Sequence, residues 1–85
     1  MAWRLRDHVS IARTEYGSVL LDQELGKYWQ LNETGTLIAE ELAAGSAEQE
    51  ICGRLTAEYD IGAEQARADV DALIAELLAA DMVTR

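Results

Sequence analysis

The segment Lys27–Gly35 constrains this chain more than any other, because it joins a strand directly to the start of a helix. It reads Lys-Tyr-Trp-Gln-Leu-Asn-Glu-Thr-Gly. Aromatic and apolar residues favour a β-strand over Lys27–Leu31, and Asn32 is suited to accept hydrogen bonds from the first free amides of a helix. The residues before this segment predict short strands, and the residues after it predict helices. We therefore expect an α+β fold in which Lys27–Leu31 is the last strand before the helices.

Two further strands are predicted upstream. Val9–Arg13 alternates apolar and polar residues, as a half-buried strand does, and Ser18–Asp22 contains a continuous apolar run. The turn at Tyr16–Ser18 and the connection Gln23–Gly26 are too short for a parallel crossover, so the three strands should form an antiparallel meander. One edge of Lys27–Leu31 then has no partner strand, and we expect the functional site at this edge.

Three helices are predicted downstream. The first runs over about residues 33–44 and stops at Gly45. The second opens at a capping box, Ser46-Ala47-Glu48-Gln49, and is broken by residues 60–62. The third, about residues 63–80, is the longest. The apolar residues at helical spacing are Leu37, Ile38 and Leu42 in the first helix, Ile51, Leu55 and Tyr59 in the second, and Val70, Leu73, Ile74, Leu77 and Leu78 in the third.

The apolar residues of the third helix and of the strand Lys27–Leu31 can each be interpreted as part of the core or as part of a binding site. In the third helix they span roughly 140° of the helical wheel, wider than the stripe of about 100° that a core needs. The surplus margin either belongs to the core or faces a ligand. Trp29 and Leu31 share one face of the predicted strand, and they likewise belong either to the core or to a groove beside the open edge. Trp3 has no placement from the sequence.

Charge is unevenly distributed along the chain, which has 16 acidic and 7 basic residues and a net charge of −9. Residues 32–85 carry twelve of the acidic and three of the basic residues, and so supply the whole net charge. A phosphate backbone is repelled by such a surface. We therefore expect no nucleic-acid partner.

The residues needed for several kinds of site are missing from the sequence. A single histidine, His8, and a single cysteine, Cys52, provide neither a closed zinc site nor a catalytic triad. The glycines stand singly and form no phosphate loop. A lone cysteine fits a reducing cytosol, and no apolar run is long enough to span a bilayer. We expect a cytoplasmic protein that is not an enzyme, needs no cofactor or metal and does not enter a membrane.

The order of these elements resembles the PqqD-like family. The resemblance rests on Tyr-Trp-Gln-Leu-Asn-x-Thr-Gly at residues 28–35, on Gly45 before the second helix, and on the apolar third helix over residues 70–78. It covers nearly the whole chain from Val9 to Val83. Within the family the chain is similar to the stand-alone leader-binding proteins of lasso-peptide biosynthesis.

This resemblance implies a single winged helix-turn-helix domain over residues 1–85, with a three-stranded antiparallel sheet packed on three helices and with residues 1–8 expected to be flexible. It implies a recognition element for ribosomally made, post-translationally modified peptides, which binds the leader of a precursor and presents it to a leader peptidase and a macrocyclase. The leader would add a strand to the third strand and rest on the third helix. The implied peptide-binding residues are Lys27, Tyr28, Trp29, Gln30 and Leu31 on the strand, and Val70, Leu73, Ile74 and Leu77 on the helix, bordered by Asp69 on one flank or Arg67 on the other. We expect a monomer or a weak dimer.

Two other classes of protein share parts of this pattern. A DNA-binding winged helix has the same architecture, but its third helix needs basic residues, whereas this one offers Asp69, Asp71 and Glu76 against Arg67 alone. An acyl carrier protein is equally small, acidic and helical. Its modified serine opens the second helix in an Asp-Ser-Leu motif, whereas Ser46 stands in Gly-Ser-Ala and three predicted strands precede it.

Overall fold

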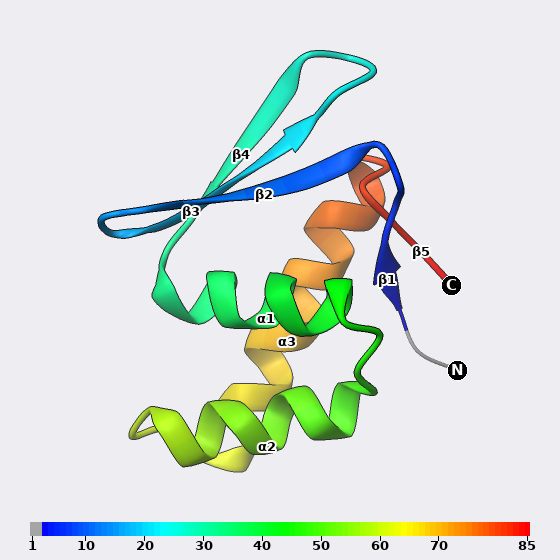
Figure 1. The fold of residues 1–85 in the computed structure, drawn as a ribbon. Helices are drawn as coiled ribbons and strands as arrows, with labels where there is room; N and C mark the ends of the chain where they lie inside the picture. Colours follow the sequence, from blue (N-terminus) through cyan, green and yellow to red (C-terminus); the bar gives the residue numbers. More distant parts are fainter. Residues whose placement is uncertain (1–2) are drawn as a thin grey trace.

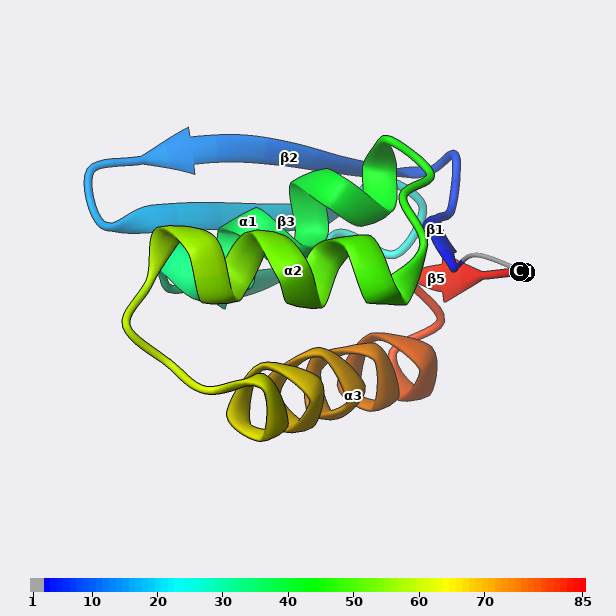
Figure 2. The same cartoon turned by 90° about the horizontal axis from the view of Figure 1, so that it is seen from below.

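The computed structural model describes residues 3–85, which form a three-stranded antiparallel sheet with three helices on one side of it (Figures 1 and 2). The strands are β1 (Arg4–Leu5), β2 (Val9–Thr14), β3 (Gly17–Asp22), β4 (Lys27–Leu31) and β5 (Val83–Thr84), and the helices are α1 (Glu33–Ala43), α2 (Glu48–Glu58) and α3 (Ala63–Ala79). The predicted α+β class and the winged helix-turn-helix arrangement of three strands on three helices are confirmed.

The sheet has the order β2-β3-β4, as expected for a meander. In the register of β3 with β4, Leu20 is paired with Trp29 and Leu21 with Tyr28. Leu20 is fully buried against the helices, whereas Leu21 and Tyr28 are 39% and 72% exposed on the opposite face. Because successive side chains of a strand point to opposite faces, the helices cover one face of the sheet and leave the other open.

The core lies between the sheet and the three helices. Each helix contributes fully or almost fully buried aliphatic side chains, and burying one such side chain contributes about 1.5–3 kcal/mol. The most deeply buried aliphatic side chains of the core are Leu20 on β3, Ile38 and Leu42 on α1, Ile51 and Leu55 on α2, Val70 and Leu77 on α3, and Met82 and Val83 after α3. A buried polar pair also joins the layers, since Ser18 Oγ on β3 lies 2.7 Å from Thr36 Oγ1 on α1.

The N-terminal segment pairs with the C-terminal end of the chain. In the described part of it, β1 pairs with β5, with Arg4 opposite Thr84 and Leu5 opposite Val83. The Arg85 guanidinium carbon lies 4.3 Å from the centre of the Trp3 ring. This pairing joins the two ends of the chain, so no local pattern predicted it. Residues 1–2 lie outside the described residues.

The start of α1 is as predicted, and the start of α2 is not. Asn32 Oδ1 accepts a hydrogen bond from the Gly35 amide at 2.9 Å. At α2 the expected capping box of Ser46 with Gln49 is wrong. The Ser46 hydroxyl instead donates to Glu41 Oε1 at 2.9 Å, and Glu50 Oε1 accepts from the Ala47 amide at 3.0 Å. The carboxylate at the end of α1 engages the serine, and the helix therefore begins after Ala47.

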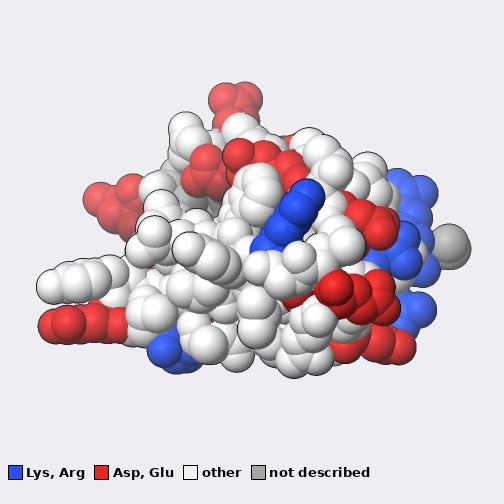
Figure 3. Space-filling model, turned by 90° about the horizontal axis from the view of Figure 1, so that it is seen from above, with Lys and Arg blue, Asp and Glu red and all other residues white. Residues whose placement is uncertain are grey.

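One face of the molecule has few charged side chains over its middle. Several Lys and Arg side chains gather at one end of this face, next to acidic ones, and a single basic side chain crosses its uncharged middle (Figure 3). No helix among residues 3–85 has the length and apolar character needed to cross a membrane.

Candidate functional site

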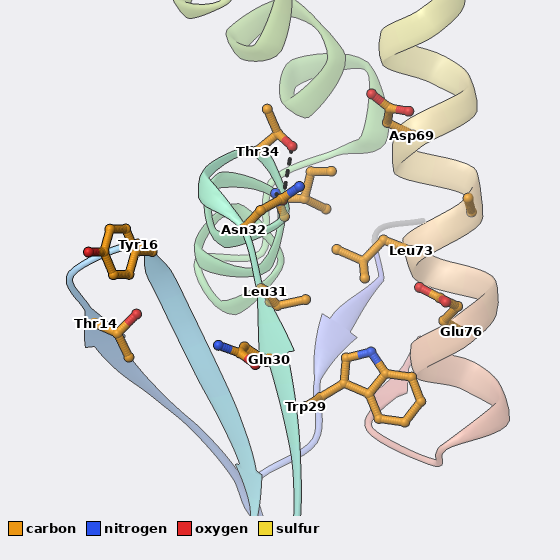
Figure 4. Close-up of a pocket in the computed structure, with 13 residues that line it drawn as sticks. Thr14, Tyr16, Trp29, Gln30, Leu31, Asn32, Thr34, Asp69, Leu73 and Glu76 are labelled. Carbon is orange, nitrogen blue, oxygen red and sulfur yellow. Dashed lines mark hydrogen bonds between the residues drawn. The ribbon is translucent and has the colours of Figure 1, made fainter.

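β4 is an open edge of the sheet, because this strand ends the order β2-β3-β4 and pairs only with β3 within residues 3–85. Helix α3 runs alongside this edge, with its N-terminal half near Asn32 and its C-terminal half near Trp29 (Figure 4). An edge strand exposes backbone donors and acceptors that another extended chain can pair with. A helix beside such an edge provides a wall against which added side chains can pack.

A cavity of about 660 Å³ lies between β4 and α3 (Figure 4). Four parts of the chain line it, namely the β2–β3 hairpin, β4, the start of α1 and one flank of α3. The lining residues are Thr14, Tyr16, Trp29, Gln30, Leu31, Asn32, Thr34, Gly35, Ile38, Asp69, Ala72, Leu73 and Glu76. The cavity therefore combines an apolar floor with polar groups at its rim, the usual character of a binding site.

A second cavity of about 430 Å³ continues this space toward the start of β4. Its lining residues are Lys27, Tyr28, Trp29, Glu76, Ala79, Ala80 and Met82. The two cavities share Trp29 and Glu76 as lining residues, and Figure 4 shows the indole of Trp29 pointing toward α3. Together they form one groove along the whole of β4, which we call the β4–α3 groove.

The structure brings seven of the eleven residues predicted for the site to the β4–α3 groove. All five residues of β4 line one or both cavities, as do Asp69 and Leu73 of α3. The other four residues lie elsewhere. Val70 and Leu77 are fully buried in the core and Ile74 is 6% exposed, while Arg67 lies 3.7 Å from Glu48 on the side of α2. The side of α3 that faces the groove is therefore the side that carries Asp69, and it differs from the side that is buried in the core.

Sequence reasoning missed the small and charged residues of this flank. Ala72, Glu76 and Ala79 line the groove together with Asp69 and Leu73. Their positions recur at three- and four-residue steps, which places them on one side of a helix. A search for large apolar side chains overlooks alanines, although small residues are what leaves room for a ligand beside a helix.

The flank of α3 that faces the groove is acidic. Asp69 is half-buried, and its Oδ1 accepts a hydrogen bond from Gln65 Nε2 at 2.7 Å. Within residues 3–85, no Lys or Arg nitrogen lies within 4.0 Å of the carboxylates of Asp69 or Glu76. The same residues contain no group of three or more His, Cys, Asp or Glu placed to hold a metal ion. The chemistry that this arrangement supports is therefore recognition of a chain by its backbone, by apolar contacts and by charge.

Comparison with known proteins gives the family. Residues 17–83 match the family described as coenzyme PQQ synthesis protein D (PqqD). The chain belongs to the PqqD family. The family assignment made from the sequence is therefore confirmed, and no curated protein matches the chain significantly.

Two solved structures are similar to this chain over nearly their whole length. The first is described as lasso peptide synthetase B1 complexed with the leader peptide. It is 39% identical, with a TM-score of 0.88 and full coverage of both chains. The second is described as TbiB1 in complex with the TbiA(beta) leader peptide. It is 25% identical, with a TM-score of 0.85, and the match covers 94% of this chain and 93% of that one.

Proposed function

We propose that this PqqD-family protein binds the leader segment of a ribosomally made precursor peptide, of the lasso class, as an extended strand added to β4. The observation that carries the proposal is the unpaired edge of β4 facing a groove along α3. It is supported by the two similar structures, each described as a complex with a leader peptide.

The physical basis is the addition of a strand to an open sheet edge. Backbone hydrogen bonds to the edge supply affinity whatever the sequence of the peptide, and pockets for alternate side chains supply selectivity. In the β4–α3 groove, Trp29 and Leu31 on the strand face Leu73 on the helix (Figure 4). An alternate side chain of the added strand would enter between them, which buries apolar area and orders the peptide.

We further propose that the protein acts in the cytoplasm as a binding protein rather than a catalyst and presents the leader to a peptidase and a macrocyclase. Two features of the surface support a presenting role. The outer face of the sheet is uncovered, with Leu21 and Tyr28 exposed beside the edge. The bound leader would lie along β4 at the margin of this face, so one enzyme could contact both. An exposed edge strand also favours weak self-pairing, and we propose a monomer or a weak dimer.

A titration tests the proposal. The leader of a precursor encoded beside this gene is synthesised and titrated into the protein, with an expected Kd from nanomolar to micromolar. Proline has no amide hydrogen and distorts an extended ladder. Tyr28 and Gln30 stand two positions apart in β4, so their amides point to the same side of the strand, which the register of the sheet makes the open edge. Tyr28→Pro and Gln30→Pro each remove one of these donors, and each should weaken binding strongly. Unchanged binding by both variants, each shown to be folded by circular dichroism, rules out strand addition.

A further inference from the structure

The side of α3 that lines the β4–α3 groove alternates acidic and apolar side chains. Leu73 lies between the carboxylates of Asp69 and Glu76. All three side chains point toward β4 (Figure 4). A helix rises about 1.5 Å per residue, so Asp69 lies about 6 Å before Leu73 along the helix axis and Glu76 about 4.5 Å beyond it. The helix therefore offers an apolar contact with a negative charge on each side.

Several carboxylates outside the groove have arginine partners. The ion pairs are Arg13 with Glu40, Arg54 with Glu41 and Glu58, Arg67 with Glu48 and Asp71, and Arg6 with Asp81. Within residues 3–85, Asp69 has no such partner, although Arg67 is only two positions away. Lys27 lines the second cavity together with Glu76, whereas no lysine or arginine lines the cavity that contains Asp69.

Asp69 is also held in place. Its side chain is half-buried, and Gln65 Nε2 donates to Oδ1 at 2.7 Å, while Oδ2 has no hydrogen-bond partner within residues 3–85. A carboxylate fixed by its neighbour loses little side-chain freedom when it binds a cation. Partial burial also weakens screening by water and salt, so a cation that enters the cavity meets a stronger attraction than it would on an open surface.

We propose that Asp69 is a specificity-determining residue that selects a lysine or arginine in the bound peptide, two positions from the apolar residue that contacts Leu73. The inference rests on the proposed function. Alternate side chains of an extended strand face the same side and lie about 6.7 Å apart, which fits the spacing of Asp69 and Leu73 along α3. The partner is thus an extended peptide with an aliphatic or aromatic residue and a basic residue at positions i and i+2, in either order.

The test is a selection from a phage-displayed library of random dodecapeptides on the immobilised full-length protein. The wild type should enrich peptides with Lys or Arg two positions from an aliphatic or aromatic residue. Asp69→Asn keeps an oxygen that can accept from Gln65 but removes the charge, and the preference should disappear. Asp71→Asn, on the flank that faces Arg67, is the matched control and should keep it. Asp69→Lys should select Asp or Glu at the same position.

Titrations with one enriched peptide give the magnitude. Replacing its basic residue by Gln should weaken binding to the wild type about fivefold, as expected for the loss of a partly exposed ion pair, and should not change binding to Asp69→Asn. A basic preference that persists in Asp69→Asn, or no basic preference in the wild type, overturns the role of Asp69. If the enriched peptides still lose binding in the Tyr28→Pro or Gln30→Pro protein, the proposed function survives that result. If the enriched peptides bind both proline variants as tightly as the wild type, the proposed function and this inference are both overturned.

Discussion

Gly17 packs directly against the carbonyl oxygen of Leu31, so that a Cβ atom at Gly17 would lie 2.1 Å from that oxygen. The φ angle of Gly17, +156°, is also one that other residues rarely adopt. This contact fixes the start of β3 against the end of β4, at the point where the chain enters α1. It therefore positions the strand that forms the open edge.

We expect Gly17→Ala to destabilise the protein by about 2–4 kcal/mol, because a backbone group has to move to make room. For a domain of this size that is a fall in Tm of about 10 °C or more. Gly53→Ala is the control, since Gly53 lies inside α2 with no atom within 4 Å of its added Cβ. It should stabilise the protein by about 0.5–1 kcal/mol through a better helix propensity. Thermal melts of both variants measure the difference, and equal Tm values would contradict the packing argument.

Asp22 should make stability depend on pH in the acid range. Its carboxylate is buried at the end of β3 and accepts hydrogen bonds from the Leu25 and Glu24 amides at 3.0 and 2.9 Å. These bonds, the Leu25 amide first, together with the nearby His8, hold the pKa of Asp22 below its ordinary value. A lowered pKa in the folded state means that the carboxylate stabilises the fold above a pH of about 4 and stops doing so as the pH falls through its folded pKa.

Urea denaturation of wild type and Asp22→Asn at pH 7 and at pH 3 measures this contribution. We expect the wild type to be the more stable protein at pH 7 and its advantage to shrink at pH 3. Asp60→Asn, at an exposed position between α2 and α3, controls for the general effect of removing one negative charge. An advantage of the wild type over Asp22→Asn that is the same at both pH values would contradict the assignment.

Alanine variants at three leucines of α3 should distinguish effects on leader binding from effects on stability. The three leucines, Leu73, Leu77 and Leu78, differ in how deeply they are buried. Leu73 lines the groove and is 7% exposed, Leu77 is fully buried and Leu78 is 50% exposed. Leu77→Ala should lose about 2–5 kcal/mol of stability, as core leucines do. Leu73→Ala should lose less stability but about 1–2 kcal/mol of leader binding, and Leu78→Ala should change neither strongly. Melts and peptide titrations on all three variants measure both quantities.

The outcome also tests which flank of α3 faces the peptide. If Leu73→Ala melts like Leu77→Ala and its folded fraction binds the leader normally, the peptide does not contact this flank. If Leu78→Ala loses the leader instead, the peptide lies on the flank of Arg67.

Trp29 should report peptide binding by its fluorescence. The side chain of Trp29 lines both cavities and is only partly buried. A strand placed along β4 would exclude water from it, so the emission should shift to shorter wavelength on titration. Trp3→Phe should keep the shift, because Trp3 lies against Arg85 at the paired termini. Trp29→Phe should abolish it, and a shift that follows Trp3 would place the peptide elsewhere.

The sequence by itself determined the three strands of the sheet, the three helices and their order. Alternation and tight turns predicted the three strands, and Asn32 and the three- and four-residue spacing of apolar residues predicted the helices, because these signals are local. The edge of Lys27–Leu31 followed from the length of the turns alone. Three of the four predicted positions on α3 that do not line the groove, Val70, Ile74 and Leu77, were chosen because they are apolar, and apolarity does not distinguish a core from a groove wall.

Only the tertiary structure decided the rotation of α3 and the pairing of the two ends of the chain. Val70 and Leu77 face the core, and Asp69, Ala72 and Glu76 face β4, because α2 packs against the other flank and engages Arg67 through Glu48. The pairing of β1 with β5 joins residues nearly the full chain apart. Both depend on contacts between segments that are distant in the sequence, and such contacts leave no periodic signal within either segment.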